Sequence, residues 1–138
     1  MAHWVFSTDP GTYSADDLRR DARTVWDGVA GAPAQKFLRE GVRRGDHALI
    51  YHTAPERRLV AVARVASDPY PDPADPAGKR MVVDLEWSAA LPRPVNLAAL
   101  KAHPVLKELK FVRQPRLSIS PLSPAEVAAL REVTGWRS

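Results

Sequence analysis

The strongest constraint on the fold lies in residues 45–65, where two apolar segments flank a short polar turn. Ala48–Tyr51 and Leu59–Val65 are rich in residues that favour strands, and the polar residues Thr53–Arg58 separate them. A Gly-Asp pair precedes the first segment, and both residue types favour turns, because glycine reaches positive φ freely and aspartate bonds its own backbone. The pattern predicts a β-hairpin.

Both faces of this hairpin are expected to be apolar, because successive side chains of a strand point to opposite sides. In the first strand, one face carries Ala48, Ile50 and His52, and the other carries His47, Leu49 and Tyr51. In the second strand, one face carries Val60 and Val62, and the other carries Leu59, Ala61, Ala63 and Val65. Such a hairpin needs a cover on both sides, which a small closed barrel or a sheet with helices laid on it supplies.

Helix signals precede and follow the hairpin. Ser14 is expected to cap a helix over Ala15–Arg23, and Pro33 to begin a second helix. Ser123-Pro124-Ala125-Glu126 has the form of a capping box with proline at the first helical position, which predicts a closing helix.

Three further segments read as strands: His3–Phe6, Met81–Trp87 and Arg116–Ser120. The proline-rich segment Ser67–Lys79 is expected to be a loop, because proline donates no backbone hydrogen bond. Strands and helices do not alternate regularly along the chain. With 138 residues, the sequence therefore predicts one mixed α+β domain built on a small curved barrel.

Sequence motifs of common enzymes are missing, and no enzymatic activity is expected. The chain has no Gly-x-Ser-x-Gly, no phosphate-cradling glycine loop and no His-Glu-x-x-His. His47 and His52 would point to opposite faces of their strand, so they cannot easily share a metal ion. The chain has no cysteine and no run of about 20 apolar residues. These features predict a cytoplasmic protein without a thiolate metal site or a membrane helix.

An aromatic and polar set lies at the ends of the expected elements: Trp4, Phe6, Thr8, Trp26, Tyr51, His52, Tyr70 and Trp87. Most of these side chains are expected in the core, Trp87 above all, because it shares the apolar face of an alternating strand. Trp26 has two interpretations, a core residue or the wall of a ligand pocket, because the Asp-Gly pair beside it lets the backbone bend around a ligand. Aromatic walls with a few directed polar groups suit a flat heterocycle such as an extruded base.

Short fragments spread along the whole chain carry a family resemblance. They are Trp4–Pro10, Trp26–Val29, Phe37–Arg39, Arg44–Asp46, Tyr51–His52, Tyr70–Pro73, Pro92–Val95 and Arg116–Ser118. Each fragment is weak alone, but their order and spacing together resemble the EVE domain, a branch of the PUA-like fold.

The resemblance implies a single domain over residues 1–138, built as a PUA-like small β-barrel flanked by short helices. It also implies a non-enzymatic pocket, without cofactor or metal, that receives a modified base, notably a 5-substituted cytosine in DNA. Carried over fragment by fragment, the ligand-binding residues are Trp4, Phe6, Thr8, Trp26, Asp27, Gly28, Tyr51, His52, Arg116 and Ser118.

The chain departs from the family pattern in two places. The family commonly has Lys-Ser-Glu-Pro where this chain has Ser7-Thr8-Asp9-Pro10, so the lysine is lost. The family also tends to follow Trp-Asp-Gly-Val with Arg-Asn and an aromatic residue, then Gln-Ala-Arg. Here the same places, residues 30–35, hold small and mostly apolar side chains. The modified base, and DNA or RNA as its carrier, stay open.

Basic residues near the C-terminal part of the chain are the expected phosphate contacts: Lys101, Lys107, Lys110 and Arg113. The alternative is a solvated basic face. The net charge of +4, with arginine supplying fifteen of the twenty positive charges, fits contact with nucleic acid.

Two other functions compete with a reader of modified bases. One is a sensor of a small molecule or nucleotide metabolite in the same pocket, which the loss of the family's cationic residues after Val29 favours. The other is a protein-interaction module that docks a partner on the proline-rich segment Ser67–Lys79. The sequence does not specify the oligomeric state or the pathway.

Overall fold

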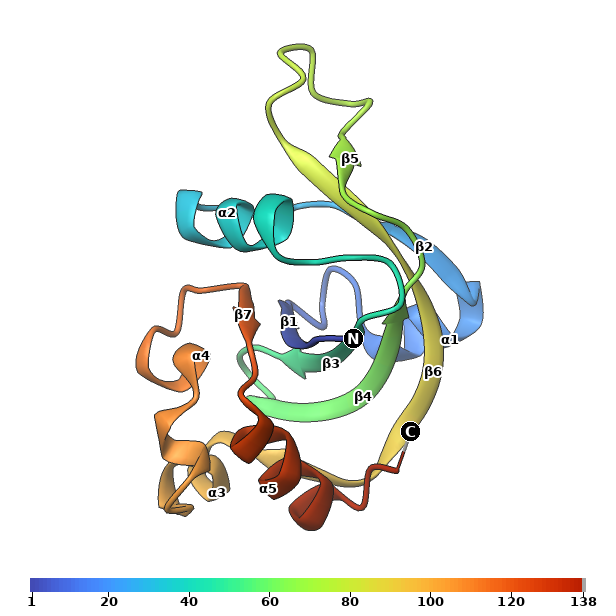
Figure 1. The fold of residues 1–138 in the computed structure, drawn as a ribbon. Coiled ribbons are helices and arrows are strands. Elements are labelled where there is room, and N and C mark those ends of the chain that lie inside the picture. The colour runs from blue at the N-terminus through green and yellow to red at the C-terminus, as the bar shows by residue number, and fades with distance from the viewer. Residues whose placement is uncertain (138) are drawn as a thin grey trace.

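The computed structural model describes residues 1–137 and shows a mixed α+β domain built on a seven-stranded sheet (Figure 1). The strands are β1 (His3–Thr8), β2 (Arg23–Trp26), β3 (His47–His52), β4 (Arg58–Val65), β5 (Tyr70–Pro71), β6 (Met81–Asn96) and β7 (Ile119–Pro121). The helices are α1 (Ala15–Asp21), α2 (Ala32–Glu40), α3 (Leu97–Ala102), α4 (Lys110–Arg113) and α5 (Pro124–Thr134), with a 3-10 turn η1 at Leu106–Glu108. The strand order is β2-β6-β4-β3-β1-β7, and β5 pairs with β6 beside this path.

The expected closed barrel is wrong, because the sheet is curved but stays open. Its path ends at β2 and at β7, and within residues 1–137 no ladder joins these two strands. β2 has four residues and β7 has three, so each offers few backbone groups for a closing ladder. The long β6 wraps around one side of the curve (Figure 1). The gap between β2 and β7 is where the candidate site lies.

The hairpin of β3 and β4 lies in the middle of the sheet and is covered on both faces, as expected. Every residue of β3 is buried. On one face, Ile50 belongs to a cluster with Leu18 of α1 and Leu38 of α2. On the other face, Leu49 belongs to a cluster with residues of α3, α4 and α5, among them Leu130. Two layers of helices therefore stabilise a sheet that is apolar on both sides.

A β-bulge at Val60 changes the expected alternation of side chains in β4. Tyr51 pairs with Leu59, while its neighbour in β3 pairs with Ala61, so Val60 has no register partner in β3. One extra residue moves the side chains beyond it to the opposite face. Leu59 therefore packs in the same cluster as Val62, whereas simple alternation placed it with Ala61.

The strand expected over Met81–Trp87 continues much further, to Asn96. This extension contains Pro92 and Pro94, although proline cannot donate a ladder hydrogen bond. Both prolines fall in an irregular stretch of β6, residues 91–94, which has no register partner in β4. The ladder resumes on either side of this stretch, so the prolines interrupt pairing without ending the strand.

Two short strands, β2 and β5, lie where no strand was expected. β2 pairs antiparallel with β6 and becomes an edge of the sheet. β5 lies within the proline-rich segment Ser67–Lys79 and pairs with the start of β6. The rest of this segment projects at the top of Figure 1, where the Asp75 carboxylate accepts hydrogen bonds from the backbone N–H groups of Ala77, Lys79 and Arg80. The Asp75 carboxylate therefore holds the projecting loop through hydrogen bonds to its backbone.

The predicted helix starts are confirmed. The hydroxyls of Ser14 and Ser123 accept hydrogen bonds from the backbone N–H groups of Asp17 and Glu126 at 3.1 and 3.2 Å. The carboxylates of these two acids in turn accept the backbone N–H of their serine. These are complete capping boxes. Helix α1 ends earlier than expected, because Arg23 already belongs to β2.

Candidate functional site

A pocket of about 480 Å³ opens in the gap between the two edges of the sheet. Three parts of the chain line it: the exit of β1 with the loop that follows, the edge strand β2 with the turn after it, and the residue that precedes β7. This volume lies within the range of small-molecule sites. Of the residues expected from the sequence, the pocket brings together Thr8, Trp26, Asp27, Gly28 and Ser118.

Trp26 forms the aromatic wall of the pocket. It ends β2 and is buried, with 7% of its surface exposed. The rings of Phe6 and Tyr13 pack against it, each with its centroid 6.0 Å from the indole centroid. The two interpretations of Trp26 are therefore compatible, because one side chain is both part of the core and part of the pocket lining.

Tyr13 is a lining residue that the sequence analysis missed. Its ring stands at 86° to that of Trp26, and its hydroxyl donates to Asp21 Oδ2 at 2.9 Å. Burial raises the pKa of the Tyr13 hydroxyl, so the group stays protonated and able to donate. A signal was present, because an apolar residue directly before the N-cap, here Ser14, commonly packs against the start of its helix.

Ser118 contributes a polar group without a partner. Its hydroxyl is buried and makes no hydrogen bond among the described residues, while its backbone carbonyl accepts the N–H of Ser7 at 2.9 Å. By contrast, the hydroxyl of Thr8 already donates to the carbonyl of Tyr13 at 2.7 Å. A buried, unpaired hydroxyl costs free energy unless something bonds to it. The Ser118 hydroxyl therefore keeps an unused hydrogen-bonding capacity beside the pocket.

The turn after Trp26 is open and depends on glycine. Gly28 has a φ of 71°, a conformation that residues with a side chain rarely adopt. A Cβ atom at this position would meet nothing within 4 Å. The glycine is therefore required by the turn of the backbone around the pocket and not by close packing.

The backbone of β2 adds hydrogen-bonding capacity beside the aromatic wall. β2 has a neighbouring strand on one side only, β6. An edge strand presents N–H and C=O groups that no other strand has paired. Because residues 24–26 line the pocket, a flat ligand against Trp26 would meet both an apolar ring and unpaired backbone groups.

A second hollow of about 460 Å³ adjoins the pocket. Ala30, Gly31, Pro33 and Ala34 form one wall, and residues 114–117 form the other. Arg116, expected to bind the ligand, lies here and not in the first pocket. The small residues of the first wall thus leave an open, mostly apolar surface next to the site.

Sequence comparison decides the family. The family model of the EVE domain matches residues 2–133 of this chain. The protein belongs to the EVE domain family. Human thymocyte nuclear protein 1 is 28% identical to it, over 91% of this chain and 70% of the human protein.

Solved structures of other proteins have folds similar to that of this EVE domain. The NMR structure of a protein from Rhodopseudomonas palustris is 31% identical and has a TM-score of 0.91, covering 98% of this chain and 94% of that one. The crystal structure of human THYN1 in complex with 5-methylcytosine containing DNA is 26% identical and has a TM-score of 0.86, with both chains fully covered. The name of the human relative refers to the nucleus, so it does not support the cytoplasmic location expected for this EVE domain, which stays a prediction.

Trp4 lies outside the pocket, near the opposite end of β1. Its indole N–H donates to Asp46 Oδ2 at 2.9 Å, and its ring packs edge-on against Phe37 of α2. Phe6 has no exposed surface and lies behind Trp26. In this EVE domain, Phe6 therefore supports the pocket wall from behind, and Trp4 packs in the core away from the pocket.

Tyr51 and His52 also lie away from the pocket. Tyr51 belongs to the cluster on the other face of the sheet, where its ring centroid is 4.7 Å from that of Phe111. His52 Nε2 accepts the backbone N–H of Ala15 at 3.0 Å, and its Nδ1 lies 3.1 Å from Glu56 Oε1. These partners place the proton on Nδ1. His52 thus ties the β3–β4 turn to the start of α1 and holds the loop that carries the pocket's Tyr13.

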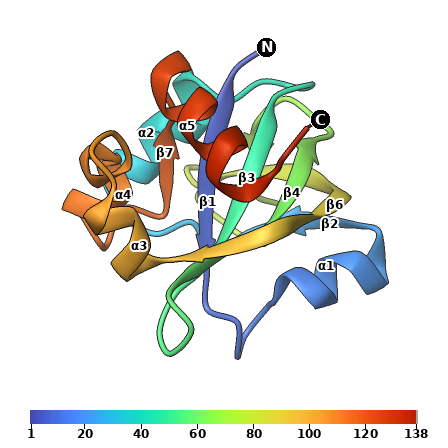
Figure 2. The ribbon, with the colours of Figure 1, turned by 90° about the horizontal axis from the view of Figure 1, so that it is seen from below.

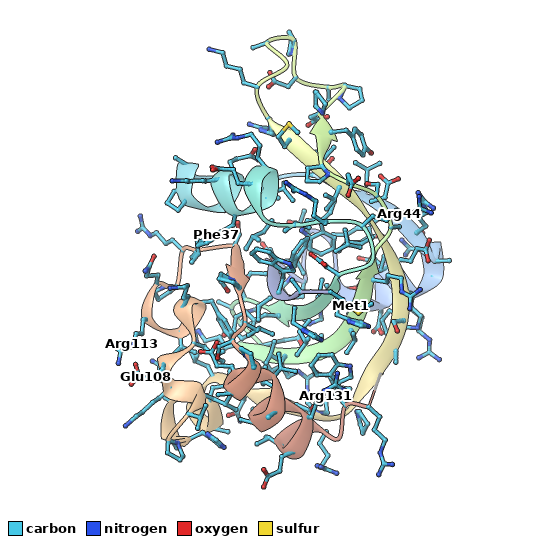
Figure 3. The ribbon with its side chains drawn as sticks, viewed as in Figure 1. Met1, Phe37, Arg44, Glu108, Arg113 and Arg131 are labelled. Atoms are coloured by element: carbon cyan, nitrogen blue, oxygen red, sulfur yellow. The ribbon has the colours of Figure 1, made fainter. Side chains whose placement is uncertain are left out.

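The basic residues expected to bind phosphates have different surroundings. Arg113 forms an ion pair with Glu108 (Figure 3), whereas Lys107 and Lys110 are exposed. Lys101 lines a groove between the β3–β4 turn and α3. In the part of the chain that the structure describes, no three His, Cys, Asp or Glu residues are grouped as metal ligands. Across residues 1–137, no helix is both long and apolar enough to cross a membrane.

Proposed function

We propose that this EVE domain reads a modified base, notably a 5-substituted cytosine in DNA, by taking it into the pocket between β2 and β7. The observation that carries the proposal is the pairing of an aromatic wall, Trp26, with the unpartnered hydroxyl of Ser118 in one pocket. A nucleobase has apolar faces and hydrogen-bonding edges, so a ring and a directed polar group match its two kinds of surface.

The human relative supports the choice of ligand. Its solved complex contains DNA with 5-methylcytosine, and that structure covers this whole chain. The family match over residues 2–133 includes every segment that lines the pocket. These likenesses favour a modified cytosine in DNA over other flat heterocycles.

Each lining residue has a proposed role. Trp26 stacks on the base, supported from behind by Phe6, and Tyr13 closes one side. Ser118 and the edge of β2 bond to the polar rim of the base, while Gly28 lets the chain turn around it. Thr8 and Asp27 line the entrance, and Arg116 in the adjoining hollow lies within the segment that a nucleic-acid strand would cross.

The pocket favours binding without catalysis. Catalysis by a serine nucleophile needs a base in contact with the hydroxyl that it activates. Ser118 has no such partner among the described residues, and His52 is bonded to Ala15 and to Glu56. The simplest activity of this arrangement is reversible binding of the base, which leaves the pocket chemically unchanged.

The test compares affinities for short DNA duplexes that are identical except for one cytosine. Duplexes with cytosine, 5-methylcytosine and 5-hydroxymethylcytosine are titrated by fluorescence anisotropy, with matched RNA duplexes as a further arm. We expect a modified DNA duplex to bind at least about tenfold more tightly than the unmodified one, a difference of about 1.4 kcal/mol. Equal affinity for all duplexes would overturn the proposal.

A sensor of a free nucleoside or nucleotide metabolite is the second candidate. The observation in its favour is one wall of the adjoining hollow, where Ala30, Gly31, Pro33 and Ala34 offer no cation to a DNA strand. Calorimetry with free 5-methyldeoxycytidine separates the two functions. A free nucleoside that binds as tightly as the methylated duplex would favour the sensor, because the DNA strand would then contribute nothing.

A further inference from the structure

A groove lined by two cations lies next to the base pocket. It consists of two adjoining hollows of about 450 and 220 Å³, both lined by Arg57, Leu97 and Lys101. We call it the Arg57–Lys101 groove. Arg57 belongs to the β3–β4 turn and Lys101 to α3, so the groove brings together segments that are far apart in the sequence. The sequence analysis did not single out Arg57.

Both cations of the groove are free to bind an anion. Among the described residues, neither Arg57 nor Lys101 forms an ion pair, and both side chains are exposed. The one acid in the lining, Glu56, is already engaged by His52 and by Arg58. The groove therefore carries a net positive charge that the protein itself does not neutralise.

The backbone holds Arg57 in a defined position. Its φ is 49°, and its N–H donates to the carbonyl of Thr53 at 3.2 Å. Its carbonyl accepts the N–H of Leu97 at 2.8 Å, which ties the turn to the start of α3. The positive charge of Arg57 also acts on the buried hydroxyl of Tyr51, whose pKa burial raises and Arg57 lowers. Arg57 thus adds its charge to the same groove that Tyr51 lines.

The groove and the base pocket are neighbours. Thr8 lines the pocket and Thr53 lines the groove, and the carbonyl of Thr8 accepts the N–H of Thr53 at 3.0 Å. On the other side, residues 114–118 run past both sites, with Pro115 in the groove and Ser118 in the pocket. Figure 2 shows the exit of β1, the β3–β4 turn and α3 at the same end of the molecule.

We propose that Arg57 and Lys101 bind a backbone phosphate of the same nucleic-acid strand whose base enters the pocket. The inference rests on the proposed function and adds the path of the strand, from the pocket across residues 114–118 to the groove. An extruded base leaves its own phosphates beside the pocket mouth, and a positively charged groove at that place binds the chain without reading its sequence. Arg57 supplies a planar fork that suits phosphate oxygens, and Lys101 supplies a point charge.

The experiment measures the salt dependence of DNA affinity for a double variant, Arg57→Gln with Lys101→Gln. The control double variant is Arg44→Gln with Arg64→Gln, which removes the same charge from two exposed arginines at the opposite end of the hairpin (Figure 3 labels Arg44). Thermal melting verifies that both variants fold. Affinities for methylated and unmethylated duplexes are measured over a range of salt concentrations.

We expect the slope of log affinity against log salt to become shallower by about one in the groove variant, because the loss of one phosphate contact removes about 0.9 from it. The control should change the slope little, and the preference for the methylated duplex should stay the same in the groove variant. A slope that matches the control would overturn the groove while leaving the base pocket intact.

The two proposals fail in distinguishable ways. If the parent protein binds DNA without preference for the modified base but the groove variant loses salt dependence, the base pocket fails and the groove stands. If the groove variant loses affinity for free inorganic phosphate as strongly as for DNA, the site is one for a free anion, and the proposed strand path is overturned. Absence of any DNA binding by the parent would overturn both proposals.

Discussion

The base pocket and the cluster around Asp46 lie at opposite ends of β1, and both contain tryptophan, yet their polar groups differ. Asp46 is buried and accepts three hydrogen bonds, from the N–H groups of Ala2, Trp4 and Arg43 at 2.9–3.0 Å. In the pocket, the buried hydroxyl of Ser118 has no partner among the described residues. The Trp4 indole is thus bonded to a carboxylate whose acceptor capacity is used, whereas Trp26 shares its pocket with a residue whose hydroxyl is not bonded.

The packing around the two tryptophans differs in the same way. A Cβ atom on Gly41 would come within 2.5 Å of the Trp4 ring, so that ring is enclosed. A Cβ atom on Gly28, beside Trp26, would meet nothing within 4 Å. The Trp4 ring is therefore enclosed beside a fully bonded Asp46 carboxylate, whereas the pocket beside Trp26 is open on one side. The comparison predicts that substitutions in the two regions affect different measurements.

The largest effect on stability is expected for Asp46→Ala. The change leaves three N–H groups without their acceptor, and each such loss costs about 1–3 kcal/mol. We expect the free energy of unfolding to fall by about 3 kcal/mol or more, measured by urea denaturation. Asp46→Asn, which keeps one acceptor oxygen, should lose less. A methylated duplex should bind the folded variant normally, and weakened binding would break the separation between the regions.

Trp26→Ala is expected to reduce both stability and affinity. Because Trp26 is buried against Phe6 and Tyr13, its removal should cost about 3–5 kcal/mol of stability. The loss of base stacking, about 1–3 kcal/mol, should weaken binding by roughly tenfold to a hundredfold. The free energy of unfolding and the affinity for the methylated duplex are measured at low temperature, where the variant stays folded.

The control for Trp26 is Trp87→Ala. Trp87 is partly buried against the same core cluster but does not line the pocket, and Arg19 lies over its ring at 5.7 Å. The Trp87→Ala variant should lose stability and keep full affinity for the methylated duplex. Equal affinity in the Trp26 and Trp87 variants would exclude Trp26 as the stacking wall.

Ser118→Ala should weaken binding without weakening the fold. Within residues 1–137 the hydroxyl has no hydrogen-bond partner, so its removal should leave the melting temperature unchanged or slightly higher. A hydrogen bond to the base is worth about 0.5–1.5 kcal/mol, so affinity should fall by about tenfold or less. A large loss of stability with unchanged affinity would contradict the assigned role.

The smallest expected effect is a pH dependence of stability that arises at the end of β1 beside Asp46. His3 and His47 stack with ring centroids 5.2 Å apart, and burial lowers the pKa of both below 6.5. Well above pH 6.5 both rings are neutral in the folded and unfolded states. As the pH falls through 6.5 towards the lower folded pKa, the unfolded chain takes up protons first. Stability should therefore decline over this window.

The pH prediction is tested by urea midpoints between pH 7.5 and 5. The variant His47→Gln, which has one such group fewer, should lose less stability over this interval than the parent protein. An identical decline in both proteins would show that other groups cause it. Affinity at the distant pocket should not depend on His47 at any pH where the protein is folded.

Local chemistry made much of the fold predictable. The central hairpin and the capped helices after Ser14 and Ser123 follow from residue types that are neighbours in the chain. The extension of β6 past Trp87 was not predictable, because two prolines in it fall in a stretch that β4 leaves unpaired. Whether a strand tolerates proline depends on its partner, which the local sequence does not contain.

The candidate site was predictable only in part. Trp26 and Ser118 were expected and line one pocket, whereas Trp4 and Tyr51 were expected and lie elsewhere. Tyr13 and Arg57 were missed. Aromatic character does not reveal which face of a sheet a side chain occupies or whether its surroundings are complete.

The sequence by itself determined the alternating hairpin, the helix caps and the family, because these depend on residue order and on contacts between close neighbours. Tertiary structure decided that the sheet stays open between β2 and β7, that Ser118 and Trp26 line one pocket there, and that Arg57 and Lys101 line one groove. These features arise where segments distant in the sequence meet. Their positions follow from the packing of both faces of the sheet as a whole, and no single segment encodes them.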